Sequence, residues 1–240
     1  MLRFALMACA AVTAFGAPAR AITYSTAGAV AAGDPGIGAA ETLVAGFDGG
    51  DSLSLDPGHS SGYGFFTGSH SGVAAAPAGD SSQYVAIGTG GHVLFDLRDF
   101  GGADGHIDSV SVYLGSLDPY NFIDLFGLDA DGNLDFSHSL LTISGSDMSP
   151  GSGDWYSAQT NRRVTMNFDA ADHVGGLMFR STGVAFEFDS IAIGAGHIDA
   201  GPDQSGAVPE PASWAMLVGG FGLIGGAMRS RCTGLALARS

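Results

Sequence analysis

The chain of 240 residues contains no lysine and only nine basic residues, all arginine, against 24 acidic residues. The imbalance is concentrated in the middle, where residues 22–208 carry four arginines against 23 acidic residues, a net formal charge of −19. The negative electrostatic field of this region repels nucleic acid phosphates and anionic lipid headgroups. We therefore expect the central region to have no nucleic acid partner.

Cysteine is almost absent as well. The two cysteines, Cys9 and Cys232, both lie outside residues 22–208. No disulfide can therefore link two parts of the central region, even in an oxidising compartment. Its stability must come from packing, with or without a bound ion.

The central region also lacks any helical stripe of apolar residues. It is rich in Asp and in glycine, of which the chain has 39, and both residue types favour turns over helices. Short apolar runs alternate with turn residues instead, as in Val110, Val112 and Leu114, which share one face of a strand while Ser109, Ser111 and Tyr113 take the other. Strands are predicted at Thr42–Phe47, Tyr63–Thr67, Tyr84–Ile87, His92–Asp96, Ile107–Leu114, Asn121–Leu128, Leu134–Ile143, Arg162–Phe168, Val174–Arg180 and Val184–Ile193. This pattern predicts an all-β fold, a jelly-roll-like β-sandwich ectodomain over residues 22–200.

The first residues have the features of an export signal. Arg3 supplies a positive charge, an apolar run extends from Phe4 to Phe15, and Ala19-Arg20-Ala21 has the small-x-small pattern of a cleavage site. The sequence predicts a secretory signal peptide over residues 1–21, cleaved before Ile22.

The last part of the chain has the features of a membrane anchor. A flexible linker is predicted over residues 201–207, followed by Pro209, Glu210 and Pro211 and then by an uncharged span, Trp214–Met228. As a helix this span would be roughly 22 Å long, short of a hydrocarbon core of about 30 Å. Arg229 and Arg231 follow it and suit the cytoplasmic side. We expect one marginal membrane helix that holds the protein in the inner membrane only transiently.

Together, Pro209-Glu210-Pro211, Trp214-Ala215, the apolar span containing Gly220-Phe221-Gly222, and the closing arginines resemble the PEP-CTERM sorting domain in its PEPxxWA variant, over residues 208–231. The resemblance implies a substrate of an exosortase, a membrane cysteine peptidase or transpeptidase, so that the catalytic groups of sorting belong to the partner. It also implies a Gram-negative bacterium that makes exopolysaccharide, and a protein that reaches the cell surface or the extracellular matrix. Residues 232–240 extend beyond the arginines at which members of this family normally end.

The tetrapeptide Gly50-Asp51-Ser52-Leu53 spells the nucleophile motif of the GDSL hydrolases. A serine nucleophile needs a base oriented by a third group and oxyanion donors. An Asp-x-x-His spelling, Asp56-Pro57-Gly58-His59, follows within a few residues in an apparent loop. We expect a turn here and no enzyme activity, with a secreted esterase as a remote alternative.

An acidic turn carries Asp129, Asp131, Asn133 and Asp135, whose alternating oxygen atoms resemble the start of a calcium loop. The EF-hand pattern fails, because its sixth and twelfth positions hold Leu134 and Leu140 instead of Gly and Glu. A hairpin turn at residues 131–133 is favoured, and a calcium site of another type remains open. Calcium is the only cofactor that the sequence leaves open.

Three aromatic residues, Tyr120, Trp155 and Tyr156, lie in stretches rich in Gly, Ser and Asp. Aromatic rings on loops bind sugar rings in many β-sandwiches, although such residues also fold inward to hold loops in place. The resemblance to the PEP-CTERM family favours a structural surface or matrix protein associated with exopolysaccharide. A carbohydrate-binding module is the alternative.

Overall fold

The computed structural model describes residues 21–28, 33–100, 107–148 and 152–194. The chain divides into two compact units, Met1–Ala200 and Gly201–Ser240, and the described residues all belong to the first. Apart from Ala21, the predicted signal peptide lies outside them, as do the linker, the sorting segment and the C-terminal tail. Among the described residues, no helix has the length and apolar character needed to cross a membrane.

The described residues form ten strands, with one four-residue helix and three short 3-10 turns. The strands are β1 (Thr23–Gly28), β2 (Glu41–Ala45), β3 (Ser61–Thr67), β4 (Gln83–Asp96), β5 (Ser109–Gly115), β6 (Asn121–Gly127), β7 (Leu141–Ser144), β8 (Arg162–Asn167), β9 (Val174–Ser181) and β10 (Phe186–Gly194). The helix is α1 (Gly145–Met148), and the 3-10 turns are η1 (Pro57–His59), η2 (Arg98–Phe100) and η3 (Ala170–Asp172). The predicted all-β class is confirmed.

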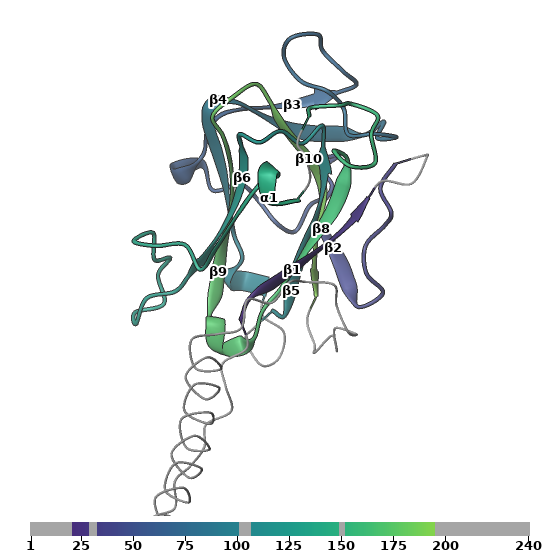
Figure 1. Cartoon of the computed structure of the whole chain (residues 1–240). Helices are drawn as coiled ribbons and strands as arrows, with labels where there is room; N and C mark the ends of the chain where they lie inside the picture. The colour runs from purple at the N-terminus through teal and green to yellow at the C-terminus, as the bar shows by residue number, and fades with distance from the viewer. Residues whose placement is uncertain (1–20, 29–32, 101–106, 149–151, 195–240) are drawn as a thin grey trace, which may run out of the picture. The chain divides into compact units, whose positions relative to one another are not determined.

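All strand pairs are antiparallel and join into one continuous sheet with the order β1-β8-β5-β10-β4-β9-β6-β7. Strand β2 pairs with the end of β10, and β3 pairs with β4. The sheet curves into a half-barrel, so that β9 and β6 stand opposite β5 and β8 (Figure 1), while the paired strands β10 and β4 lie between them in the sheet. The sequence predicted a jelly-roll sandwich, and the observed all-β half-barrel agrees with it at the level of fold class.

Strand β4 connects the two halves of the sheet. Its first part pairs with β10 and its last part with β9. Between them lies a glycine run, residues 88–91, which the sequence predicted as a loop between two strands; this was wrong. A side chain at Gly91 would lie 2.5 Å from the carbonyl oxygen of Gly62 in β3, and Gly90 has a positive φ of 75°. Glycine thus allows one long strand to bend where the sheet curves.

The two halves share one hydrophobic core. Val112 and Met166 reach it from β5 and β8, and Ile123 reaches it from β6. The rings of Phe179 in β9 and Phe188 in β10 stack at 4.0 Å between centroids and join the two halves directly. Apolar burial of this kind supplies most of the driving force for folding in a chain without a central disulfide.

The second face of β5, which carries Ser109, Ser111 and Tyr113, is also buried. Ser111 donates a hydrogen bond of 2.9 Å to the buried carboxylate of Glu41, and the hydroxyl of Tyr113 donates one of 2.7 Å to the carbonyl oxygen of Ala78. Residues 72–82, which we call the covering segment, contribute Ala78 to this layer. Alternation therefore predicted the strand correctly but not the cover over its polar face.

Two further strand predictions were inaccurate. Strand β1 was missed, because Thr23–Gly28 has no apolar alternation and lies at the edge of the sheet on β8. The predicted strand Leu134–Ile143 is a strand only from Leu141, because the preceding residues form a hairpin closed by the bridge between Leu128 and Leu134.

Candidate functional site

The covering segment is held on the sheet by buried polar side chains. The main-chain amide of Ala75 donates a hydrogen bond of 2.9 Å to Glu187 Oε1 on β10. The amide of Ala78 donates one of 2.8 Å to Asn161 Oδ1. Both contacts join residues far apart in the sequence, so the segment forms a fixed wall on this face of the sheet.

A cleft of about 90 Å³ lies between this wall and the loop that carries Trp155. We call it the Trp155 cleft. Its lining consists of Gly72, Val73, Ala74, Ala75, Ser116, Asp118, Gly153, Trp155, Val184, Ala185 and Glu187. Val73, Trp155 and Val184 are exposed apolar side chains, whereas Ser116, Asp118 and Glu187 supply oxygen atoms. The cleft thus combines an aromatic surface with hydrogen-bond acceptors, the usual composition of a small-ligand site.

Glu187 is the most perturbed acid of the cleft. Its side chain is buried, with 2% of the residue exposed, and its Oε2 accepts a hydrogen bond of 2.6 Å from the hydroxyl of Ser116. The pKa of Glu187 is raised to about 7, mainly by burial and to a smaller extent by the carboxylate of Asp118, against the opposing hydrogen bonds from Ser116 and Ala75. The side of the cleft that contains Asp118 and Glu187 is therefore acidic.

The loop that carries Trp155 is fixed by the buried side chain of Asn161. The Asn161 amide nitrogen lies 3.1 Å from the carbonyl oxygens of both Trp155 and Ser157 and 3.2 Å from that of Asp154. The hydroxyl of Thr160 also donates to the carbonyl of Asp154. Trp155 is 38% exposed on this fixed loop, so a ligand would meet a preorganised ring.

The three predicted aromatic residues take different places. Trp155 lines the cleft, whereas Tyr156 is 85% exposed and is not part of its lining. The ring of Tyr120 packs against Gly183, and its hydroxyl lies 2.7 Å from both Asp118 Oδ2 and the carbonyl oxygen of Val184. Burial, followed by the contact with Asp118, raises the pKa of the Tyr120 hydroxyl. Tyr120 therefore positions Asp118 and the chain at Val184 instead of presenting its face to a ligand.

The sequence did not single out Glu187, Asp118 or Ser116. One signal for Glu187 was present: it is one of two glutamates in residues 22–208 and stands between two core residues, Phe186 and Phe188. A lone carboxylate in an apolar alternating strand indicates that the other face of the strand is also covered. Asp118 and Ser116 carried no such signal.

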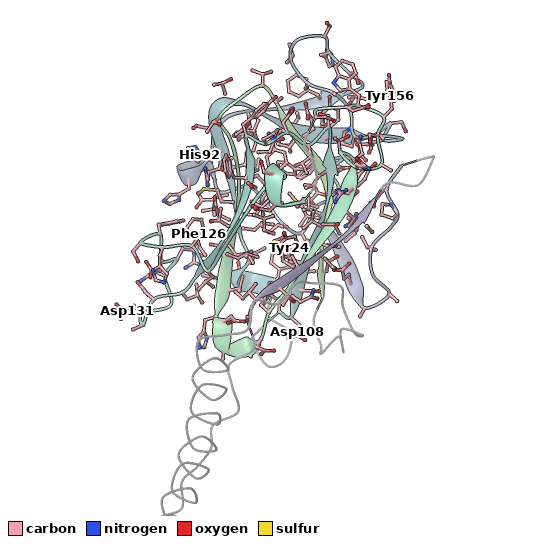
Figure 2. All side chains as sticks on the ribbon, in the orientation of Figure 1. Tyr24, His92, Asp108, Phe126, Asp131 and Tyr156 are labelled. Carbon is pink, nitrogen blue, oxygen red and sulfur yellow. The ribbon has the colours of Figure 1, made fainter. Side chains whose placement is uncertain are left out.

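The acidic turn lies away from the cleft. Figure 2 shows Asp131 and Tyr156 on opposite sides of the domain. The carboxylate of Asp129 accepts hydrogen bonds of 2.9 and 2.8 Å from the amides of Asp131 and Asn133, and Asp135 accepts one from the amide of Ser137. The hydrogen bonds from Asn133 and Asp131 lower the pKa of Asp129, and the side chain and then the amide of Ser137 lower the pKa of Asp135. The carboxylates hold a hairpin turn, and within the described residues no group of three or more His, Cys, Asp or Glu side chains is arranged to hold a metal.

The Gly-Asp-Ser-Leu sequence also forms a turn. Asp51 accepts hydrogen bonds of 2.9 and 3.0 Å from the amides of Gly46 and Phe47, and the hydroxyl of Ser52 lies 3.4 Å from the carbonyl oxygen of Val44. His59 contacts Asp56 at 2.8 Å, and the structure gives Ser52 no contact with this pair. We therefore attribute the presence of the Gly-Asp-Ser-Leu tetrapeptide to the turn that it forms.

Comparison with known proteins places one segment of the chain in a family. Residues 207–231 match the PEP-CTERM protein-sorting motif. No curated protein matches the chain.

Several solved structures resemble the chain weakly. A carbohydrate binding module from the lichenase 5A of Cellvibrio mixtus is 16% identical, with 65% of this chain and 98% of that chain covered and a TM-score of 0.35. A CBM22-1 xylan-binding domain from Paenibacillus barcinonensis is 13% identical over 67% of this chain and 100% of that chain, with a TM-score of 0.37. A glycoside hydrolase family 43 arabinoxylan arabinofuranohydrolase from Bacillus subtilis is 26% identical over 50% of this chain, which spans 23% of that enzyme, with a TM-score of 0.32. Scores of this size establish neither a common fold nor a common function.

The match at residues 207–231 includes every sorting residue that the sequence singled out, namely Pro209, Glu210, Pro211, Trp214, Arg229 and Arg231. These residues lie outside the described part of the structure. The chain therefore carries the PEP-CTERM protein-sorting motif.

Proposed function

We propose that the chain is an exported, non-enzymatic surface protein, sorted by an exosortase, whose β domain associates with exopolysaccharide by binding sugar rings in the Trp155 cleft. The observation that carries the binding role is the cleft itself. It brings an exposed tryptophan on a fixed loop together with the carboxylate of Asp118, from segments far apart in the sequence.

Both parts of the cleft suit a sugar. The apolar face of a sugar ring stacks on an aromatic ring, and its hydroxyl groups donate hydrogen bonds to carboxylate oxygens. Asp118 is half-buried and already oriented by Tyr120, so little conformational entropy is lost when it accepts a ligand hydroxyl.

The charge of the cleft restricts the kind of polysaccharide. Asp118 and Glu187 lie together in the cleft, and residues 22–208 have a net formal charge of −19. Uronic acids and other anionic sugars would be repelled. The cleft therefore suits neutral sugars or sugars that carry an amino group.

Export and sorting follow from the two ends of the chain. The signal peptide directs the chain through the inner membrane of a Gram-negative bacterium, and the apolar span before Arg229 and Arg231 holds it there transiently. Pro209 and Pro211 restrict the residues before them to extended conformations, which suits recognition by a peptidase at the membrane surface. The exosortase supplies the catalytic groups and releases the protein to the cell surface or the medium.

The binding role is tested by affinity electrophoresis or calorimetry of the full chain with exopolysaccharide purified from a PEP-CTERM host. Trp155→Ala should abolish most of the binding, because it removes the aromatic surface. Tyr156→Ala is the matched control, since it removes a neighbouring exposed aromatic ring that does not line the cleft. Equal binding by the two variants would reject the cleft as the site.

The sorting role is tested separately by replacing Pro209-Glu210-Pro211 with alanines in a host that contains an exosortase. This variant should accumulate as a larger, membrane-bound precursor, while the native chain loses its tail and appears at the surface or in the medium. Alanine at Pro202, in the predicted linker, is the control and should leave processing unchanged. If the native chain and the motif variant have the same size and the same location, the sorting proposal is wrong.

A further inference from the structure

Two carboxylates meet beneath the covering segment, beside the polar face of β10. Asp80 belongs to the covering segment and Asp189 to β10. The hydroxyl of Ser82 is hydrogen-bonded to Asp80 Oδ1 and also lies 3.3 Å from Asp189 Oδ2. Because a hydroxyl has one proton, Ser82 can donate to only one of the two carboxylates at a time.

Each carboxylate also has a buried oxygen atom without a partner. Asp189 is only 4% exposed, and its Oδ1 has no hydrogen-bond partner. Oδ2 of Asp80 is likewise buried and unpartnered. An unpaired carboxylate oxygen removed from water is strongly unfavourable, so the pair needs a positive charge or a proton beside it.

The local backbone turns further oxygen ligands toward the same place. Strand β10 has a register shift between Asp189 and Ala192, and Ser190 within it has a positive φ of 52°. Bulges of this kind redirect side chains. The Ser190 hydroxyl lies 3.2 Å from Asp189 Oδ2, the same oxygen atom that the Ser82 hydroxyl contacts.

The neighbouring cation does not neutralise the pair. Arg163 Nη1 donates a hydrogen bond of 3.0 Å to the carbonyl oxygen of Ser190. Its guanidinium is itself paired with Asp34, whose Oδ1 lies 2.9 Å from Arg163 Nε. The charge of Arg163 is therefore already balanced by Asp34.

We propose that Asp80 and Asp189 bind a calcium ion, with the hydroxyls of Ser82 and Ser190 as additional oxygen ligands. Calcium is bound by irregular sets of oxygen atoms, whereas magnesium requires a near-octahedral arrangement. Such an ion would supply the positive charge that the two unpartnered carboxylate oxygens lack. It also ties the covering segment to β10 and so stabilises the wall of the Trp155 cleft.

The main rival is a proton shared by the two carboxylates. Burial, and to a smaller extent the charge of Asp80, raises the pKa of Asp189 to about 7 in the absence of a metal. A shared proton satisfies only one of the two unpartnered oxygens and predicts no response to calcium.

The test is the thermal unfolding of the full chain at pH 7.5, in detergent, after removal of metals with a chelator. Extracellular calcium modules have dissociation constants of about 0.1–1 mM, so 10 mM calcium should raise the melting temperature by about 3–10 °C. Magnesium at the same concentration should have a much smaller effect. Asp189→Asn should abolish the calcium response and, since it removes a buried charge, should still fold in calcium-free buffer.

Two further variants make the result specific to this site. Asp80→Asn should also abolish the response, independently of any change in β10. Asp129→Asn, in the hairpin turn, is the matched control and should keep the full calcium shift. The proposal is overturned if calcium leaves the melting temperature of the native chain unchanged, or if the shift is lost in Asp129→Asn and kept in Asp189→Asn.

Discussion

The buried carboxyl of Glu187 should make the stability of the β domain depend on pH. Its pKa in the folded chain is about 7, against an ordinary value of 4.5. Below pH 4.5 the carboxyl is protonated in both the folded and the unfolded chain, and its contribution to stability is fully present. As the pH rises toward 7 the unfolded chain releases this proton while the folded chain retains it, so the free energy of unfolding decreases.

The size of the effect follows from the pKa difference. One pKa unit corresponds to 1.36 kcal/mol, so the contribution of Glu187 falls by about 3 kcal/mol between pH 4.5 and pH 7. For a chain of this length this corresponds to a decrease of about 6–12 °C in melting temperature.

The substitution Glu187→Gln isolates the contribution of this carboxyl to the free energy of unfolding. The amide side chain has the same shape, and it can still accept the hydrogen bond from the amide of Ala75 and exchange one with the hydroxyl of Ser116. The variant should therefore match the native chain near pH 4.5 and exceed its stability by about 3 kcal/mol above pH 7. Thermal or urea unfolding at a series of pH values, with chelator present, measures the difference.

Glu210→Gln is the matched control, because it removes one carboxylate outside the β domain. It should show the same pH dependence as the native chain. Parallel stability curves for Glu187→Gln and the native chain between pH 4.5 and pH 8 would refute the reasoning, since they would mean that water reaches this carboxyl in the folded state.

Three other results are expected. Asn161→Ala should lower the free energy of unfolding by about 2–3 kcal/mol, because it leaves the half-buried amide of Ala78 and the carbonyls of the Trp155 loop without their partner; urea unfolding measures this, and a loss below about 1 kcal/mol would contradict it. Ser52→Ala should change stability by less than about 1 kcal/mol and leave the turnover of a generic ester at the background rate, whereas a loss of measurable turnover would point to an esterase. N-terminal sequencing of the exported protein should begin at Ile22, and finding Met1 there would reject cleavage of the signal peptide.

The sequence alone predicted the β class, because strand formation depends on local alternation. Val110, Val112 and Leu114 alternate with polar residues in the sequence and do point into the core. The same local rule failed for β1, which has no apolar face, and at residues 88–91, where glycines that signal a loop in most sequences allow a long strand to bend. Both exceptions depend on neighbours that are distant in the chain.

The sorting motif was also readable from the sequence by itself. A peptidase that recognises such a segment contacts consecutive residues. Recognition of Pro209, Glu210 and Pro211 therefore depends on their order in the sequence. Their function does not depend on which other parts of this chain lie near them.

The candidate site, by contrast, was decided only by the tertiary structure. Trp155 could be selected as an exposed aromatic residue, but its neighbours Val73 and Glu187 come from segments that long-range strand pairing brings together. Asp80 and Asp189, 109 positions apart, likewise meet only because the covering segment folds back over β10. Apolar alternation specifies which side of a strand faces the core, but what covers the other side depends on contacts between distant segments, and those contacts created both the cleft and the carboxylate pair.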